Sequence, residues 1–486
     1  MVRKFSSYAL GIYAALFIGS VIGVVTKSII AKELGKESFG LYTYFVSLTV
    51  VSASVFSLGM SDILTKVTAE QKPYSNDFNR FGIALVFGVT FVAVIAGILL
   101  AGVIEPIYVM ALFALGPAAL LPVATSVFRG ELSTKREVSY RLLRRVAELG
   151  FVALLVVVLA IRDEIVAVYA VVASWYLTTL YLLFLMKKRD LFISPRRFVD
   201  VARQPWLRTH IVFSVSLWLA EIVTILGSQA DSLIVGNALG FVELGEYGAA
   251  LLFYGLVLQV LHVLANLFVT MFPRDNNKDL PNYRRIFNMN ALLIPLIGMG
   301  TLLFIPLLSP VLLDDTYRLV TPLFAVLSFA LVFRSLELPN RALAITIDKP
   351  QVNMQATLAS IAIYLPTLWI LVNRLGLLGA ALSQVIFWAL YSTVQAFLLR
   401  RHLPGHAAHG VRTALVGFGV YAVAIGAFLA LADPALRLIV PPLLYAGLGH
   451  LLRLWDVRVL WQFGQTLVAS VRRRLARAAS TPSEPV

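Results

Sequence analysis

The chain has 486 residues, of which 59% are apolar and only 14% charged, and its mean hydropathy is +0.83. These values exclude a soluble globular protein of this length and predict a chain that lies in a lipid bilayer. The formal net charge of +15 follows membrane topology, so we expect no nucleic-acid partner, and the absence of cysteine excludes disulfides and thiolate metal sites.

Fourteen stretches are apolar enough to cross a bilayer as helices, which takes about 18 or more residues. The strict alternation of a membrane β-barrel is missing from the sequence, so the predicted fold is an all-α polytopic membrane protein. The stretches lie near residues 8–30, 40–64, 81–103, 107–128, 143–161, 164–186, 210–235, 247–271, 287–313, 319–338, 352–372, 377–399, 412–431 and 436–452.

The distribution of Lys and Arg predicts the orientation. With the N-terminus inside, most of the 41 basic residues fall in segments that face the cytoplasm, as the positive-inside rule requires. We therefore expect a multi-pass protein of the cell (cytoplasmic) membrane with both termini in the cytoplasm. The outer loops hold only Lys32, Lys36, Arg162, Arg318, Arg374 and Arg437.

A short turn after the first predicted helix occurs twice. Residues 34–42 read LGKESFGLY and residues 239–247 read LGFVELGEY. The first helix also carries a stripe of small residues that lets another helix approach closely. The stripe is Gly11, Ala15, Gly19 and Gly23, and the repeat mates, 205 positions apart, are Gly35 and Gly240, Gly40 and Gly245, and Tyr42 and Tyr247.

The repeat predicts two six-helix lobes around a central cleft, because helices 1–2 and 7–8 occupy equivalent places. An even number of helices separates the copies, so the lobes are parallel repeats. Chance recurrence in a glycine-bearing apolar chain is the alternative. The predicted domains are an N-lobe at 1–195, an amphipathic linker at 196–209, a C-lobe at 210–400, two further helices at 401–452 and a basic amphipathic tail at 453–486 that, like the linker, suits anionic lipids.

Ionisable residues inside membrane helices are costly and face a partner or an aqueous cavity. Lys27 lies near the outer end of the first helix, and its repeat mate Ser232 is next to Asp231. We expect Lys27 and Asp231 to line the cleft, where they pair, contact an anionic substrate or hold a coupling cation. The alternative is that Lys27 reaches the outer headgroups and Asp231 caps polar backbone.

The seventh predicted helix carries its polar residues on one face, at spacings of three and four from Ser214 to Asp231. Glu221 lies deep in it and is predicted as a cation or proton site, with a buried ion pair as the alternative. The eighth helix repeats the pattern. The predicted substrate cleft comprises Lys27, Glu221, Ser228, Gln259, His262 and Asn266, and the predicted coupling-cation residues are Asp231 and Glu221.

Arg334, Glu337 and Arg341 lie at spacings of three and four in the tenth helix, which predicts a local charge ladder. With Arg129 they form the predicted cytoplasmic gate. The histidine-bearing loop RRHLPGHAAHG, residues 400–410, lacks a carboxylate, so we expect no metal site. Phosphate-loop, nucleophile-elbow and HExxH signatures are missing, which predicts a transporter and not an enzyme. We expect no cofactor, and Na⁺ or H⁺ is the candidate coupling ion.

Three stretches carry a resemblance to a known group. Residues 26–45 read TKSIIAKELGKESFGLYTYF, residues 128–131 read FRGE, and residues 375–386 read LGLLGAALSQVI. With its fourteen predicted helices, the chain resembles the polysaccharide and oligosaccharide-lipid flippases of the multidrug/oligosaccharidyl-lipid/polysaccharide (MOP) exporter superfamily.

The resemblance implies a flippase that exports a polyprenyl-(di)phosphate-linked oligosaccharide or polysaccharide repeat unit from the inner to the outer leaflet by alternating access. It implies that Lys27 serves a cationic cleft, and that Asp231 holds a driving cation with Gln355 and Thr357 as candidate ligands. Lys27 is the only basic residue in the outward half of a predicted lobe helix, which departs from a strongly cationic cleft. The expected partners are the lipid-linked glycan, anionic membrane lipids and glycan-assembly enzymes, and the expected state is a monomer.

Three alternatives stay open. A drug/cation antiporter of the same superfamily would use Glu221 and Asp231 for protons or sodium, but twelve helices would suit it better. A non-transporting membrane scaffold has little reason to keep Glu221 on a polar face. A glycan polymerase would have a large outer loop, whereas the outer loops here are short.

Overall fold

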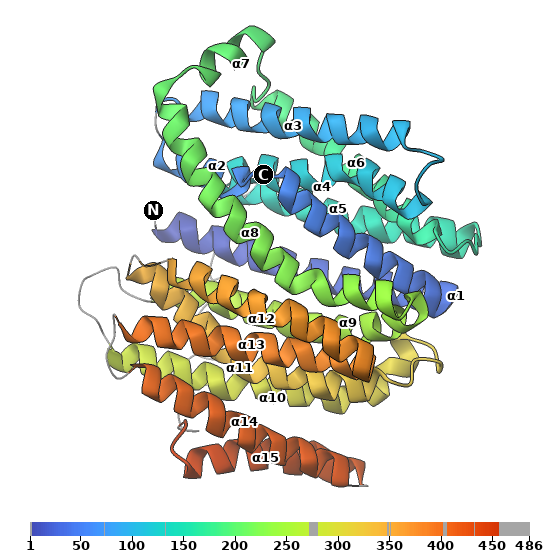
Figure 1. The fold of residues 1–486 in the computed structure, drawn as a ribbon, viewed down its shortest axis with the longest axis vertical. Helices are drawn as coiled ribbons and strands as arrows, with labels where there is room; N and C mark the ends of the chain where they lie inside the picture. The colour runs from blue at the N-terminus through green and yellow to red at the C-terminus, as the bar shows by residue number, and fades with distance from the viewer. Residues whose placement is uncertain are drawn as a thin grey trace, which may run out of the picture. The chain divides into compact units, whose positions relative to one another are not determined.

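The computed structural model describes residues 2–71, 73–131, 133–271, 280–347, 349, 351–401, 406–431 and 433–455. These residues contain no β-strand, which confirms the predicted all-α fold. The helices (Figure 1) are α1 (Val2–Phe56), α2 (Met60–Glu70), α3 (Ser75–Leu99), α4 (Pro106–Gly130), α5 (Thr134–Val152) with a π-helical continuation (Ala153–Val158), α6 (Val166–Lys188), α7 (Pro195–Ala202), α8 (Pro205–Ala238), α9 (Phe241–Met271), α10 (Leu280–Leu312), α11 (Val320–Thr346), α12 (Gln351–Leu375), α13 (Leu377–Arg400), α14 (His406–Ala430) and α15 (Pro434–Leu451).

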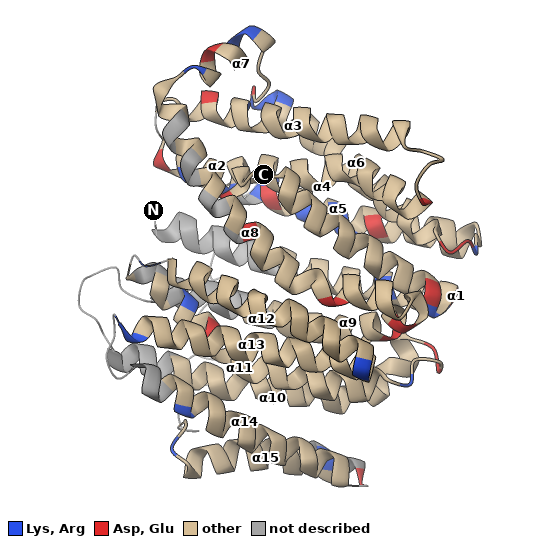
Figure 2. Ribbon diagram, in the orientation of Figure 1, with Lys and Arg blue, Asp and Glu red and all other residues tan. Residues whose placement is uncertain are grey.

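All fourteen predicted stretches fall on helical segments. Among the described residues, ten helical spans are long and apolar enough to cross a membrane, as expected of a multi-pass membrane protein. The count of fourteen spans stays a prediction. Figure 2 shows Lys, Arg, Asp and Glu mainly toward helix ends, with long uncharged stretches between them.

Both repeated turns change the chain direction at a glycine. In α1 the backbone leaves the helical conformation at Gly35, with φ 80°, and the chain doubles back there (Figure 1). Helices α8 and α9 meet at Gly240, with φ 101°. A positive φ is strained for residues with a side chain, so glycine suits both positions. The repeat seen in the sequence therefore has a structural counterpart.

The second predicted helix, 40–64, is interrupted. Leu58 and Gly59 take positive φ values and separate α1 from α2. Side chains of α8 satisfy carbonyls freed at this break: Ser214 Oγ donates to Leu58 O at 2.8 Å, and Trp218 Nε1 donates to the last turn of α1 at 2.9 and 3.1 Å. A Cβ at Gly59 would lie 2.5 Å from the carbonyl oxygen of Ser214, so a larger residue would force the two segments apart.

Residue contacts divide the chain into two compact units. Unit 1 comprises Met1–Val263, Phe304–Leu327 and Thr357–Phe387, and unit 2 comprises Leu264–Leu303, Ser328–Ala356 and Trp388–Val486. The predicted lobe boundaries stay a prediction.

Aromatic side chains contribute to the core of each unit. In unit 1, Phe78 and Phe128 are fully buried in a cluster built by α2, α3, α4 and α6. In unit 2, Tyr445 of α15 donates to the carbonyl oxygen of Ala291 at 2.8 Å and contacts the Tyr421 ring edge to face at 5.5 Å. The buried hydroxyl thus gains a backbone acceptor where water is absent.

Candidate functional site

The two repeated turns pack against each other within unit 1. A Cβ added at Gly40 would lie 1.8 Å from the carbonyl oxygen of Phe241, and one added at Gly245 would lie 2.1 Å from that of Lys36. Lys36 and Phe241 are themselves repeat mates, so the two contacts are equivalent under the symmetry of the repeat. Only glycine permits such a close approach of two backbones. This contact explains the glycine in both copies.

An ion pair spans the same contact. Lys36 Nζ pairs with the carboxylate of Glu246 and lies 5.3 Å from the centre of the Tyr317 ring. Glu246 is buried and also accepts a hydrogen bond from the backbone N–H of Leu319. Because these groups come from both turns and from the segment before α11, they tie this end of unit 1 together.

The repeated tyrosines each donate to a buried carboxylate. Tyr42 OH donates to Glu148 Oε1 of α5 at 3.0 Å, and Tyr247 OH donates to Asp231 Oδ2 of α8 at 2.7 Å. Glu148 is 3% exposed and Asp231 1% exposed. Carboxylates this enclosed need such donors, because no bulk water solvates them. Each turn is therefore coupled to a buried acid.

Around Glu148 the structure gathers a cation cluster, formed by Lys27, Arg144 and Arg145. Arg145 donates to Glu148 at 3.0 Å, and its side chain lies against Gly19 and Gly23 of α1. Lys27 lies within electrostatic range of Arg145 and Glu148 but has no hydrogen bond or ion pair among the described residues. The small-residue stripe of the first helix thus accommodates an arginine side chain here.

Arg144 points toward α6, where its guanidinium lies 4.9 Å from the centre of the Trp175 ring. Its Nε is buried and has no hydrogen-bond acceptor in the described part of the chain. An unsatisfied buried donor is costly and calls for an explanation. Lys27 and Arg145 interact with Glu148, and Arg144 lies within electrostatic range of Tyr42, which donates to the same carboxylate. Three cations therefore gather near one acid in this cluster.

Asp231 belongs to a second buried cluster, built by α8, α9, α12 and α13. Its Oδ2 also accepts from Gln384 Nε2 at 3.0 Å, and Gln384 Nε2 lies 3.1 Å from Tyr364 OH. Its Oδ1 accepts from the backbone N–H of Ser232 at 2.8 Å. Gln384, a partner that the sequence did not predict, lies in the stretch LGLLGAALSQVI, residues 375–386.

The Asp231 cluster offers one carboxylate, two phenol oxygens and one amide. This set suits a proton or a single monovalent cation better than Mg²⁺ or Ca²⁺, which prefer several oxygen ligands including carboxylates. Among the residues that the structure describes, no group of three or more His, Asp or Glu could hold a metal ion. Gln355 is exposed and Thr357 is buried, and neither is a hydrogen-bond partner of Asp231.

Removing the Tyr247 hydroxyl tests the Asp231 cluster. We expect Tyr247→Phe to lower stability by about 1–3 kcal/mol, because a buried carboxylate loses a donor at 2.7 Å. Tyr42→Phe, its repeat mate, is the matched variant and should cost a similar amount, since each carboxylate loses one tyrosine donor and keeps others: Arg145 at Glu148, and Gln384 with the Ser232 N–H at Asp231. Thermal unfolding of the purified protein measures both, and equal melting temperatures for Tyr247→Phe and the parent protein would contradict the expectation.

Glu221 lies at the break between α1 and α2. Ser57 Oγ donates to Glu221 Oε2 at 3.4 Å, and Asp62 is close enough to interact with it electrostatically. No ion pair of Glu221 occurs among the described residues, so the structure offers no support for the alternative of a buried pair.

Of the other predicted cleft residues, two have described side chains. Ser228 is exposed and donates to Ile225 O of its own helix at 2.8 Å, and Gln259 is half-buried. The side chains of His262 and Asn266 lie outside the described residues. Lys27 and Asp231 do not pair in this part of the chain, because their neighbours belong to the separate clusters around Glu148 and Gln384.

The predicted gate residues make local contacts. In unit 2, Arg334 lies 3.9 Å from Glu337 and its guanidinium lies 3.8 Å from the centre of the Trp388 ring. Arg341 is exposed and forms no ion pair with the described residues. In unit 1, Arg129 lies 3.7 Å from Glu137. The charge ladder therefore comprises Arg334 and Glu337 alone.

Comparison with solved structures shows the fold. The chain is similar to the lipid II flippase MurJ in an inward closed conformation, with TM-score 0.65 and 12% identity over 94% of this chain and 99% of that one. It is also similar to an inward-facing multidrug resistance MATE family transporter of the MOP superfamily, with TM-score 0.58 and 16% identity over 81% of this chain and 96% of that one. A MOP superfamily transporter from Pyrococcus furiosus has TM-score 0.56 and 17% identity over 81% of this chain and 95% of that one.

These likenesses show that the chain has the fold of these MOP superfamily structures. No curated protein matches the sequence. The family model described as polysaccharide biosynthesis protein matches residues 8–275, which is more than half of the chain. The chain therefore belongs to the family of polysaccharide biosynthesis proteins.

Proposed function

We propose that the protein is a flippase that moves a polyprenyl-(di)phosphate-linked oligosaccharide or polysaccharide repeat unit from the inner to the outer leaflet. The observation that carries the proposal is the cation cluster. Among the described residues, Lys27 has no ion-pair partner and Arg144 Nε has no hydrogen-bond acceptor. Cations inside a membrane protein are expensive and mark a path for an anionic group. Membership of a polysaccharide biosynthesis family supports a glycan as the attached cargo.

The cluster would hold the diphosphate while the lipid tail stays in the bilayer. Arginine offers paired N–H donors for phosphate oxygens and lysine a point charge. Gly19 and Gly23 leave room for Arg145 to lie along α1, and Glu148 fixes one end of it. A diphosphate bound there would supply the missing acceptor for Arg144 and a counter-ion for Lys27.

Alternating access requires contacts that open in turn. The second limb of α1 contacts α8 at two places: Tyr44 hydrogen-bonds Asn237 at one end, and Trp218 donates to Ser54 at the other. In the orientation that the charge distribution predicts, the first contact and the packed turns close the outer side. The contact at Gly59 lies on the inner side. The substrate would enter when the inner contact opens and leave when the turns separate.

A coupling cation or proton would bind at Asp231, with Glu221 as a second acid on the same helix. Tyr247 connects Asp231 to the repeated turn, so a change of charge at Asp231 would reach the packed turns through one hydrogen bond. The protein would act in the cytoplasmic membrane as a monomer with both termini inside. Anionic lipids would surround it, and glycan-assembly enzymes would deliver the substrate.

Leaflet exchange in proteoliposomes tests the proposal. We expect protein-dependent movement of a polyprenyl-diphosphate-linked oligosaccharide, read by protection of the sugar from an external lectin, with and without a sodium or proton gradient. If the protein instead moved no lipid-linked glycan under either gradient and drove cation-dependent movement of a small cationic dye, that result would contradict the flippase and support the drug/cation antiporter. Asp231→Asn should abolish the response to the gradient if the cation binds there.

A further inference from the structure

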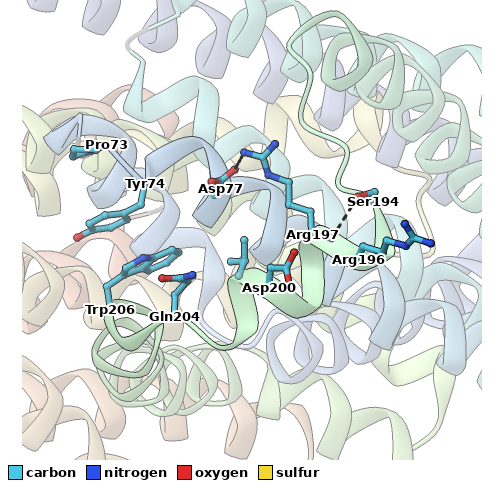
Figure 3. Close-up of a pocket in the computed structure, with 10 residues that line it drawn as sticks. Pro73, Tyr74, Asp77, Ser194, Arg196, Arg197, Asp200, Gln204 and Trp206 are labelled. Carbon is cyan, nitrogen blue, oxygen red and sulfur yellow. Dashed lines mark hydrogen bonds and ion pairs between the residues drawn. The ribbon is translucent and has the colours of Figure 1, made fainter.

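A polar pocket of about 660 Å³ lies beside α7, in unit 1 and away from the two clusters described above. Its walls come from the turn before α3, from α7 and from the start of α8 (Figure 3). Ligand sites commonly have volumes of about 300–1,000 Å³ and combine aromatic walls with a few polar groups. The volume and lining of this pocket match that description.

The floor of the pocket is held in place by contacts between α3 and α7. Phe198 of α7 stacks on Phe81 of α3, with ring centres 4.6 Å apart, and Arg197 pairs with Asp77 at 2.9 Å. A dashed line in Figure 3 marks the ion pair between Arg197 and Asp77. A short amphipathic helix is thereby fixed on the bundle.

An aromatic platform forms one wall. The Trp206 ring stacks on Tyr74 at 4.5 Å with an angle of 12°, and Tyr74 OH lies 3.0 Å from His210 Nε2. Trp206 is half-buried and lines the pocket. Flat, half-covered indole rings offer an apolar surface beside polar groups.

Three further polar side chains of the lining differ in character. Arg196, Asp200 and Gln204 are exposed and have no hydrogen-bond or ion-pair partner among the described residues. They supply a guanidinium donor, a carboxylate acceptor and an amide that is both. One free positive and one free negative charge balance, so the pocket does not favour an anion such as a lipid phosphate, which the carboxylate would repel.

We propose that this pocket binds an uncharged sugar, whose hydroxyls both donate and accept while its C–H face packs on Trp206. The identity of that sugar as the glycan end of the lipid-linked substrate rests on the proposed function. In the predicted orientation the pocket opens on the cytoplasmic side, at the linker between the two predicted lobes. It captures the glycan before the diphosphate enters the cation cluster.

The test uses the full chain in nanodiscs and saturation-transfer NMR with four free sugars: N-acetylglucosamine, glucose, galactose and rhamnose. We expect transfer to at least one of them with a Kd of about 1 mM. Asp200→Asn and Trp206→Leu should each weaken binding at least about tenfold. Arg203→Gln, an exposed change next to the pocket that does not line it, should leave binding unchanged. Asp200 is exposed, so replacing it with Asn should leave the fold intact, and a loss of binding would report on the pocket itself.

Two results would overturn the inference: no saturation transfer from any sugar at about 20 mM, well above the expected Kd, or binding that both pocket variants leave intact. Transfer from glycerol 3-phosphate in place of the sugars would also overturn it, in favour of a lipid headgroup site. In the leaflet-exchange assay, Asp200→Asn should raise the half-saturating concentration of lipid-linked glycan and keep the maximal rate. Sugar binding without any leaflet exchange would contradict the proposed function but would still support the sugar site.

Discussion

Gly245→Ala should reduce leaflet exchange at least about tenfold, whereas Gly255→Ala, in the same helix, should leave it unchanged. A Cβ at Gly245 would lie 2.1 Å from the backbone oxygen of Lys36, while a Cβ at Gly255 meets nothing within 4 Å. Overpacking costs about 1–3 kcal/mol even where side chains can adjust, and here the neighbour is backbone. Since about 1.4 kcal/mol is tenfold in population, the closed turns would become rare.

The same variants can be followed without transport. The chain contains no cysteine, so Lys36→Cys with Glu246→Cys introduces the only two thiols, at the ion pair between the turns. A short bismaleimide should link them in the Gly255→Ala background and fail to do so in the Gly245→Ala background. Equal cross-linking and equal exchange in both backgrounds would show that the packed turns are not needed for the cycle.

Lys27→Gln should weaken the apparent affinity for the lipid-linked diphosphate about 10- to 150-fold, the equivalent of one charge-assisted hydrogen bond worth about 1.5–3 kcal/mol. Lys27 has no hydrogen bond or ion pair with the described residues, so its removal leaves no buried partner behind. This makes it a cleaner test than Arg145, whose loss would strand Glu148.

Lys32→Gln provides the control, because Lys32 is on the same helix but exposed and donates only to Val311 O at 2.8 Å. Lys27→Arg should keep most of the affinity by keeping the charge. Exchange measured against substrate concentration separates the variants. If Lys27→Gln and Lys32→Gln had equal half-saturating concentrations, Lys27 would not contact the substrate.

The sequence was sufficient to predict the helical fold and the equivalence of the two turns, because glycine spacing and hydropathy are local signals. It could not predict that Gly40 meets Phe241 and Gly245 meets Lys36, since that contact arises only when segments 205 positions apart pack together. The tyrosines of the motif were likewise visible, but their buried acceptors, Glu148 and Asp231, lie on other helices.

The cation cluster was missed for a different reason. Hydropathy began the fifth predicted helix at residue 143, so Arg144 and Arg145 fell at its cytoplasmic edge, although α5 begins at Thr134. Ser133 at the N-cap and Glu137 in the first turn are helix-start signals that hydropathy ignores. These signals would have placed both arginines a few turns inside a helix. An ionisable side chain there is costly and indicates a functional role.

The reciprocal contact of the turns also constrains how the gene can change. Each turn presents its own carbonyl to the other's glycine, so inserting or deleting one residue between Lys36 and Gly40 would misplace both contacts at once. A compensating change of equal length between Phe241 and Gly245 would restore the match. Loop lengths at these two sites should therefore vary together among related chains or not vary at all, unlike ordinary surface loops, which tolerate insertions independently.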